Sequence, residues 1–419
     1  MRNVYDQYSQ PENKLTHSLA STLREDKDLL KSFLKHVGCA DPGQSAKLHI
    51  IEQSIAGDLE PPEDEAERRG LPDAWIYNDD GWCLLIESKV ESRLTTDQLV
   101  RHYRTAERCG FDDITVLSIE ALKTTIKPKE WLLSTTWAEI YEWLIGQKAS
   151  SRWARSTADY FEVAERKFTD AGYLKEGNIT VFAGIPFCKE IPYNYAEAKR
   201  LIKLALEEIR KDTAFCRDAK INPNVGGRGA ITGTKSKYVW DFLRLDKSSG
   251  EDSHTAFPHF TFSISDFWVH TSITIPNSIQ NQFRKNLTSL GYERFRVLIA
   301  EVVENLEPLI DREPRLSPWC TSVQRRYPSQ RSVPIVDATL EFDLRTAIES
   351  TEPKVKPQEA WLKAAYDTLC NKKSNYQIQI GAVIPFEDAR CVPSKELLSL
   401  VKGIWLACRP LLDVVVEDR

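Results

Sequence analysis

Apolar residues in the first part of the chain follow two different spacings, one typical of helices and one typical of strands. Within residues 11–37 the leucines recur every three to four positions, which predicts one or two amphipathic helices. Residues 71–90 read LPDAWIYNDDGWCLLIESKV, in which two short apolar runs flank a polar Asn-Asp-Asp-Gly stretch. This pattern predicts a β-hairpin. The acidic, proline-bearing residues 57–70 before it are typical of a surface loop.

The pattern after the hairpin predicts alternating helices and strands. Residues 95–111 begin with a threonine cap and end near a glycine, as a helix does. Residues 114–120 predict a strand, and residues 131–147 a loop that enters a helix capped by Thr135 or Thr136. Residues 1–150 therefore predict an α/β domain, a mixed sheet flanked by helices. Residues 151–174 predict a connecting helix.

The remaining residues, 175–419, predict an α+β region. The expected strands are residues 178–187, one or two strands within 259–276, then 336–344 and 375–386. The expected helices are residues 194–212, 278–309, 357–370 and 394–415, and a glycine-rich basic stretch covers 222–243. The similar segments VFAGIPF and IGAVIPF suggest two related halves, about 175–310 and 335–419, although so short a match can arise by chance.

Composition narrows the class of protein. The chain has 419 residues, enough for two or three domains, with 42% hydrophobic and 28% charged residues. It has neither a run of membrane-spanning length nor the apolar stretch of a signal peptide, so we expect a cytoplasmic protein. The nine scattered cysteines form no CxxC pair and predict reduced core residues. A net charge of -5 argues against non-specific coating of nucleic acid, but allows one local basic groove.

The predicted hairpin places three charged residues together. Glu87 and Lys89 are two positions apart on one strand, so their side chains share a face. The turn brings Asp73 opposite Ile86 or Glu87. Because the strand WCLLIESKV is apolar on both faces before Glu87, it is typical of a central strand, where two charges are costly. The simpler interpretation is a hairpin whose polar face meets solvent.

Two carboxylates and one ammonium suit one kind of chemistry. Paired carboxylates bind Mg²⁺, which keeps several waters and accepts phosphate oxygens, and Mn²⁺ can substitute for it. Such an ion activates water and stabilises the charge that develops when a phosphodiester is attacked. A neighbouring lysine can position the attacking water or offset phosphate charge. The cluster therefore predicts a phosphodiester hydrolase.

The same residues resemble the PD-(D/E)XK nuclease superfamily, whose motif is Pro-Asp, a hairpin, then Glu-x-Lys. Pro72 and Asp73 match the first part, and residues 87–89 match the second. Glu12 stands where many members carry an acidic residue on the first core helix. Gln98 resembles a glutamine of RecB-like members, although their Gln-x-x-x-Tyr pattern is absent because Tyr103 comes five positions later. The resemblance covers residues 1 to about 145.

The resemblance implies a restriction-endonuclease-like fold and a role for each matching residue. Glu12, Asp73 and Glu87 would hold Mg²⁺, Lys89 would assist the nucleophile, and Gln98 would support the site. It implies a Mg²⁺-dependent nuclease that acts on nucleic acid, with DNA expected, and a place in restriction or anti-phage defence. For Glu12 the alternative is an ordinary acid at a helix N-terminus, and for Gln98 an exposed helix residue.

Basic residues elsewhere offer weaker candidates for nucleic-acid contacts. Arg101 shares a helical face with Gln98. The stretch NVGGRGAITGTKSK carries Arg228, Lys235 and Lys237, but Gly233 precedes Thr234, so it is not a phosphate-binding loop. It predicts a flexible basic loop that could touch a nucleic-acid backbone. The segment QRRYPSQR predicts a solvated loop, and the histidines at 254, 259 and 270 have no metal-site spacing and predict sheet residues.

Two other functions stay open at this level. The nuclease fold could be a catalytically inactive scaffold, with residues 175–419 binding a partner protein or a nucleotide ligand. A different metal-dependent phosphoesterase is the third. The sequence leaves open whether the substrate is DNA or RNA, whether cutting is internal or from an end, and whether the chain forms a homodimer through residues 175–419.

Overall fold

The computed structural model divides the chain into two compact units, unit 1 (Met1–Val181) and unit 2 (Phe182–Arg419). Each unit has its own hydrophobic core. The structure describes residues 8–39, 42–43, 47–53, 71–174, 177–188, 191–229, 231, 236–246, 254, 256–276, 282–329, 332, 334–347, 358–371, 375–385 and 392–416. In this part of the chain, no helix has the length and apolar character needed to cross a membrane.

Unit 1 is built on a mixed five-stranded sheet in the order β1-β2-β3-β4-β5. The first three strands pair antiparallel, and β4 and β5 each pair parallel to their neighbour. The elements are α1 (Pro11–Glu25), α2 (Lys27–His36), β1 (His49–Glu52), β2 (Ala74–Tyr77), β3 (Trp82–Lys89), α4 (Thr96–Arg108), β4 (Asp113–Glu120), β5 (Leu132–Thr136), α5 (Trp137–Gln147) and α6 (Arg152–Ala171). The predicted α/β class with a mixed sheet is confirmed.

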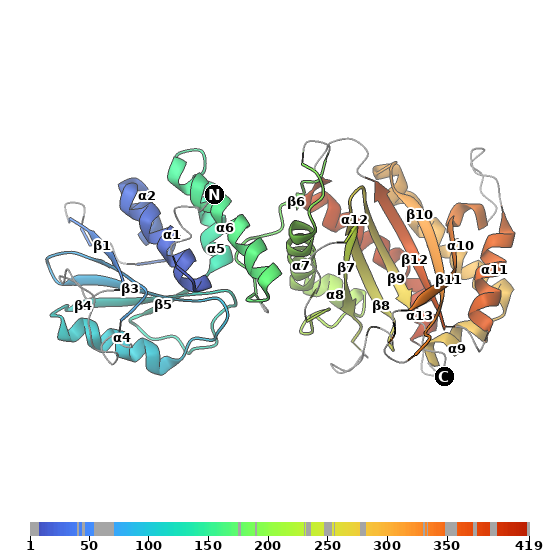
Figure 1. Ribbon diagram of the computed structural model, residues 1–419, viewed down its shortest axis with the longest axis horizontal. Helices are drawn as coiled ribbons and strands as arrows, with labels where there is room; N and C mark the ends of the chain where they lie inside the picture. Colours follow the sequence, from blue (N-terminus) through green and yellow to red (C-terminus); the bar gives the residue numbers. More distant parts are fainter. Residues whose placement is uncertain are drawn as a thin grey trace. The chain divides into compact units, whose positions relative to one another are not determined.

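Helices cover both faces of this sheet, as Figure 1 shows. On one face, Ile76 and Ile86 join a core that includes residues of α1, α5 and α6. On the other face, Trp75 and Leu85 pack with Leu99 of α4. Strand β3 is therefore the buried central strand that its apolar run predicts, and residues at odd positions of β3 face α4.

The hairpin forms where the sequence predicts it. The side chain of Asn78 accepts hydrogen bonds from the backbone N–H groups of Asp80 and Trp82. Of the four turn residues only Gly81 has a positive φ, 89°, so one glycine supplies the left-handed position. Ala74 pairs with Ile86 and Tyr77 with Cys83. This register places Asp73, the next residue, beside Glu87.

Residues 11–37 form two helices, one of the two predicted alternatives, because Asp26 interrupts them and its side chain caps α2 by accepting from the N–H of Leu29. Other expectations for unit 1 need correction. Strands β1 and β5 were not predicted. Each is short and partly exposed, and pairing with a neighbouring strand, which a local pattern does not show, determines its structure.

The boundary between the units lies after Val181 and not within the expected linker at residues 151–174. Helix α6 packs Phe161 into the core of unit 1, and the carboxylate of Glu165 accepts hydrogen bonds from the N–H groups of Ile179 and Thr180. Those two N–H groups are therefore not available to a strand. The predicted strand 178–187 is wrong except for β6 (Gly184–Ile185).

Unit 2 is an antiparallel six-stranded sheet in the order β11-β10-β12-β9-β8-β7, with helices packed on it. The elements after β6 are α7 (Tyr195–Lys211), α8 (Thr213–Asp218), β7 (Tyr238–Arg244), β8 (His259–Ser265), β9 (Trp268–Ile275), α9 (Gln282–Thr288), α10 (Tyr292–Arg312), β10 (Ser317–Arg326), β11 (Ile335–Asp343), η1 (Leu344–Ala347), α11 (Glu359–Cys370), β12 (Asn375–Pro385), β13 (Val392–Pro393), α12 (Ser394–Ala407) and α13 (Arg409–Val415). The expected α+β character is confirmed. Strands β7 and β10 were missed, so the segment predicted as a solvated loop begins with the end of β10.

The two suggested halves of unit 2 share one sheet. Strand β12, from the second half, pairs with β9 from the first. The predicted helix 278–309 is two helices, because Gly291 between α9 and α10 has a φ of 78°. The predicted helix 394–415 likewise divides at Cys408.

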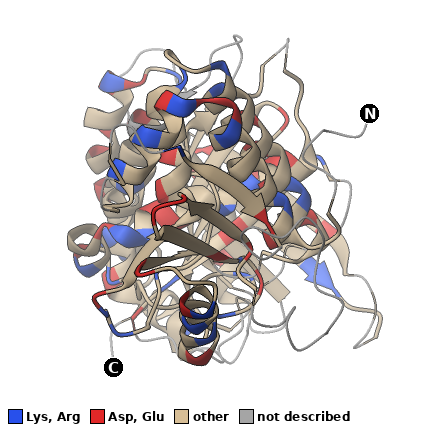
Figure 2. Ribbon diagram, turned by 90° about the vertical axis from the view of Figure 1, so that its left-hand side faces the viewer, with Lys and Arg blue, Asp and Glu red and all other residues tan. Residues whose placement is uncertain are grey.

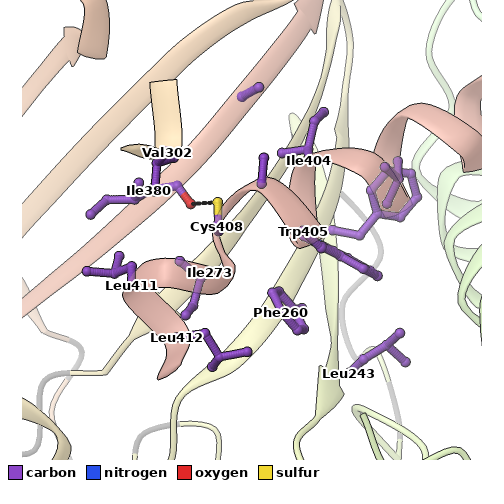
Figure 3. Packing of buried hydrophobic residues seen from close by; sticks show 14 of the residues in the cluster. Leu243, Phe260, Ile273, Val302, Ile380, Ile404, Trp405, Cys408, Leu411 and Leu412 are labelled. Carbon is purple, nitrogen blue, oxygen red and sulfur yellow. Dashed lines mark hydrogen bonds between the residues drawn. The ribbon is translucent and has the colours of Figure 1, made fainter. Parts of the chain in front are cut away.

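The core of unit 2 forms where one face of the sheet meets helix α12. Figure 3 shows Trp405 of α12 beside Phe260 of β8, with Ile273 and Ile380 close by. The thiol of Cys408 donates to the carbonyl of Ile380 at 3.5 Å. Every cysteine that the structure describes is free, as predicted, but the predicted core position is wrong for Cys109 and Cys370, which are exposed.

Candidate functional site

The candidate site lies where the β2–β3 hairpin meets α1 and α4. One carboxylate oxygen of Asp73, Oδ2, accepts hydrogen bonds from the backbone N–H of Ser88 at 2.8 Å and from its hydroxyl at 2.9 Å. The hydroxyl of Ser88 also lies 2.7 Å from that of Thr16 on α1. Asp73 is therefore fixed by the central residue of the Glu-x-Lys motif, which faces away from Glu87 and toward α1.

Glu87 is the most enclosed acid of the site, with 2% of its surface exposed. Its Oε1 accepts a hydrogen bond from Lys89 Nζ at 2.6 Å and another from the side-chain amide of Gln98. Its Oε2 lies 3.1 Å from Nε2 of His102. Strand β3 thus provides the acid and the lysine, and α4 provides two more partners.

The two carboxyl groups have opposite pKa shifts. Burial, and next the charge of Glu87, raise the pKa of Asp73 from 3.8 to about 7, although Lys89 opposes this. Burial alone would also raise the pKa of Glu87, but His102 and Lys89 outweigh it and lower that pKa. Without a bound cation, Asp73 is therefore partly protonated at neutral pH while Glu87 stays ionised. Such divided pairs are typical of functional sites.

Lys89 remains a cation in this setting. Burial would lower the pKa of its ammonium, but the charges of Glu87 and Asp73 outweigh burial and raise the pKa. Glu12 adds to the same effect, so its carboxylate is near enough to act on Lys89. Glu12 lies in the first turn of α1, one turn before Thr16. The structure thus brings all four of Glu12, Asp73, Glu87 and Lys89 to one region.

The carboxylate oxygens of the site suit a hard cation such as Mg²⁺, but the described residues do not form a complete coordination shell. Among them, no three His, Cys, Asp or Glu side chains are arranged to hold a metal ion. Asp73 uses Oδ2 for both Ser88 donors, and no hydrogen bond to its Oδ1 is found in the described part of the chain. Asp73 therefore has one open oxygen, while both oxygens of Glu87 are occupied.

The weaker nucleic-acid candidates are spread over both units. Arg101 is exposed on α4, and Lys237 is exposed just before β7. Arg228 donates from its guanidinium to the carbonyl of Trp240 and stacks 4.6 Å from the centre of that ring, so it also anchors its loop. Lys235 lies outside the described residues. Figure 2 shows acidic and basic positions interspersed along the helices, consistent with the near-balanced composition.

The structure adds two residues that the motif did not indicate. His102 stands four positions after Gln98, where RecB-like members carry a tyrosine, and this spacing indicates a shared helical face but not the contact with Glu87. Glu120 ends β4 in register with Lys89, and only the sheet pairing shows this. His259 and His270 are strand residues, as expected, with burial lowering their pKa values to about 4 and 3. Searches with the whole chain found no matching family model, curated protein or solved structure.

Proposed function

We propose that this protein is a Mg²⁺-dependent nuclease of the PD-(D/E)XK type, with unit 1 as a restriction-endonuclease-like catalytic domain. The observation that carries the proposal is that three motif residues gather at one end of the β2–β3 hairpin: Lys89 bonds Glu87, and the charges of both act on Asp73. Asp73 has a raised pKa, because burial and the charge of Glu87 outweigh the opposing effect of Lys89, so this carboxyl group lacks counter-charge. A divalent cation would supply what is missing.

Each residue then has a task in phosphodiester hydrolysis. Asp73 and Glu87 would hold the cation with help from Glu12, and a bound Mg²⁺ supplies an activated water and a positive centre for the phosphate. Lys89, whose charge is maintained by its acidic neighbours, orients that water or stabilises the phosphate charge. Gln98 and His102 fix the orientation of the Glu87 carboxylate.

The expected substrate is DNA, with a role in restriction or anti-phage defence, and both follow from the resemblance alone. Arg101 on α4 is exposed on the helix that carries Gln98, so it is suitably placed for a phosphate contact in unit 1. Arg228 and Lys237 would contribute a further contact from unit 2. Unit 2 would then serve recognition, regulation or assembly.

One observation favours a second candidate, a nuclease fold that no longer cuts. Both oxygens of Glu87 are paired with protein groups, so the cluster is neutralised without a metal. In that case the function would belong to residues 175–419, which would bind a partner protein or a nucleotide ligand. Measuring cleavage and metal binding together separates the two candidates.

The test is a cleavage assay with the full-length protein. Supercoiled, linear and single-stranded DNA and an RNA are incubated with Mg²⁺, Mn²⁺ or EDTA. We expect cleavage with either metal and none with EDTA. Asp73→Asn and Lys89→Met should each lower the rate at least about 100-fold, because each removes a group that acts on the developing charge.

The matched control is Glu107→Gln, which removes a carboxylate that is exposed on α4 and makes no contact with the site. It should cut at the wild-type rate. A wild type that cuts none of the four substrates, or variants at Asp73 and Lys89 that cut as well as wild type, would contradict the nuclease proposal.

A further inference from the structure

Glu120 has a buried carboxylate to which the proposed function assigns no role. It is the last residue of β4, and only 9% of its surface is exposed. Its Oε1 is enclosed and makes no hydrogen bond in the described part of the chain. A buried carboxylate oxygen without a donor is costly, and native structures keep few of them. This oxygen therefore needs a partner that the present state does not provide.

The nearest cation on the neighbouring strand is Lys89. In the parallel β3–β4 ladder, Lys89 pairs with Glu120 and Glu87 with Ser118. Val116, on the same strand, packs in the cluster that contains Leu99 of α4. Glu120 is four residues after Val116, so its side chain lies on the same face of the sheet, toward α4. Neighbouring strands are about 4.8 Å apart, a separation that a lysine side chain can bridge. Glu120 is thus beside Lys89 on the face that Glu87 also occupies.

Lys89 currently occupies a position that a metal would need. Its ammonium bonds Oε1 of Glu87 at 2.6 Å, and the amide of Gln98 bonds the same oxygen. His102 contacts the other oxygen. A cation cannot bind to Oε1 while a second positive charge remains on it. Lys89 must therefore move before Oε1 of Glu87 can become a metal ligand.

We propose that Glu120 is the positioning residue that receives Lys89 when Glu87 takes up a divalent cation. The ammonium leaves Oε1 of Glu87 and donates to Oε1 of Glu120, so both the metal and the lysine end with a carboxylate partner. No proton is exchanged and no bond other than hydrogen bonds changes. The inference rests on the proposed function only in requiring a metal at Asp73 and Glu87.

The test measures Mn²⁺ binding by calorimetry to the full-length protein, without any substrate. Glu120→Gln keeps the size of the side chain but removes its charge. We expect it to weaken Mn²⁺ binding about tenfold, since a charge-assisted hydrogen bond to Lys89 is lost only in the bound state. In a Lys89→Met background no ammonium has to move, so adding Glu120→Gln should change the affinity less than about twofold. Glu107→Gln is again the matched control.

Each outcome has a distinct meaning. If wild type binds no Mn²⁺, the metal site fails and the proposed function fails with this inference. If wild type and Glu120→Gln bind equally, only the inference is overturned. If Glu120→Gln weakens binding just as much in the Lys89→Met background, Glu120 acts directly on the metal, which also overturns its role toward Lys89.

A measurement on the unaltered protein makes the test independent of variant folding. In a crystal structure of the wild type with Mn²⁺, Lys89 Nζ should lie about 3 Å from a Glu120 oxygen and away from Glu87. Lys89 still bonded to Glu87 beside a bound Mn²⁺ would overturn the inference.

Discussion

At the residue scale, Ser88 links the two halves of the site. Its N–H and hydroxyl hold Asp73, and the hydroxyl also contacts Thr16 of the helix that carries Glu12. We predict that Ser88→Ala lowers the free energy of unfolding by about 1–3 kcal/mol, because a partly buried carboxylate loses one of its donors. Urea denaturation measures this, with Ser150→Ala on the surface as the neutral control. Equal stability of the two variants would show that the Ser88 hydroxyl does not hold Asp73.

The raised pKa of Asp73 predicts how stability depends on pH. Because the folded-state pKa, about 7, is above the ordinary value of 3.8, its stabilising contribution is complete below pH 3.8 and is lost as pH rises through 7. In EDTA, wild type should lose about 2–3 kcal/mol between pH 5 and 8 relative to Asp73→Asn, in which this group cannot ionise. Denaturation of both proteins at several pH values checks this. Parallel pH curves would contradict the shift.

The sequence predicted the positions of some site residues but not of others. The period of two along a strand placed Glu87 and Lys89 together, and the turn placed Asp73 beside them, as the register confirms. Ser88 was counted only as the variable position of the motif. The partners of Glu87 on α4 depend on how that helix packs, so the sequence indicated the face but not the contact of His102.

At the element scale, α4 determines the orientation of Glu87 through one face of the helix. We predict that His102→Ala lowers both Mn²⁺ affinity and the cleavage rate about tenfold, because Glu87 loses the partner of its Oε2. Arg104→Ala, an exposed position on the same helix, should leave both unchanged. Calorimetry and the cleavage assay measure the two effects. A full rate with the His102 variant would show that α4 has no positioning role.

Elements with strong local patterns were predicted well, and those fixed by partners were not. The strand WCLLIESK and the helix from Thr96 follow from their own apolar spacing and threonine cap. By contrast, residues 178–187 alternate like a strand, but Glu165 takes the N–H groups of Ile179 and Thr180. Strands β1, β5, β7 and β10 exist because neighbouring strands pair with them, and a local pattern carries little of that information.

At the scale of the whole molecule, unit 1 holds every matching motif residue and has its own core. We predict that a fragment of residues 1–181 unfolds cooperatively and binds Mn²⁺ as the full chain does, since every residue of the proposed metal site belongs to unit 1. Thermal unfolding and calorimetry of the fragment check this. A fragment that is unfolded, or folded but unable to bind Mn²⁺, would show that unit 2 is needed to complete unit 1.

The role of unit 2 was the least predictable feature. Its sequence carries no catalytic pattern, and the similar segments VFAGIPF and IGAVIPF proved to have different structures. In the first only Gly184 and Ile185 form a strand, whereas the second contributes to β12 in the sheet centre. The sheet brings together strands that are far apart in the chain, such as β9 and β12. Such pairing follows from packing of the whole unit and not from local spacing.

The proposed function requires Asp73, Glu87 and Lys89 to act together with a metal ion in hydrolysing nucleic acid. The most direct measurement is the single-turnover cleavage rate of end-labelled DNA by wild type and Lys89→Met, as Mg²⁺ is raised from zero. We predict that the wild-type rate rises from zero and saturates with Mg²⁺, and that the variant rate is at least about 100-fold lower at saturating Mg²⁺. Equal rates for the two proteins, or a wild-type rate that does not depend on Mg²⁺, would contradict it.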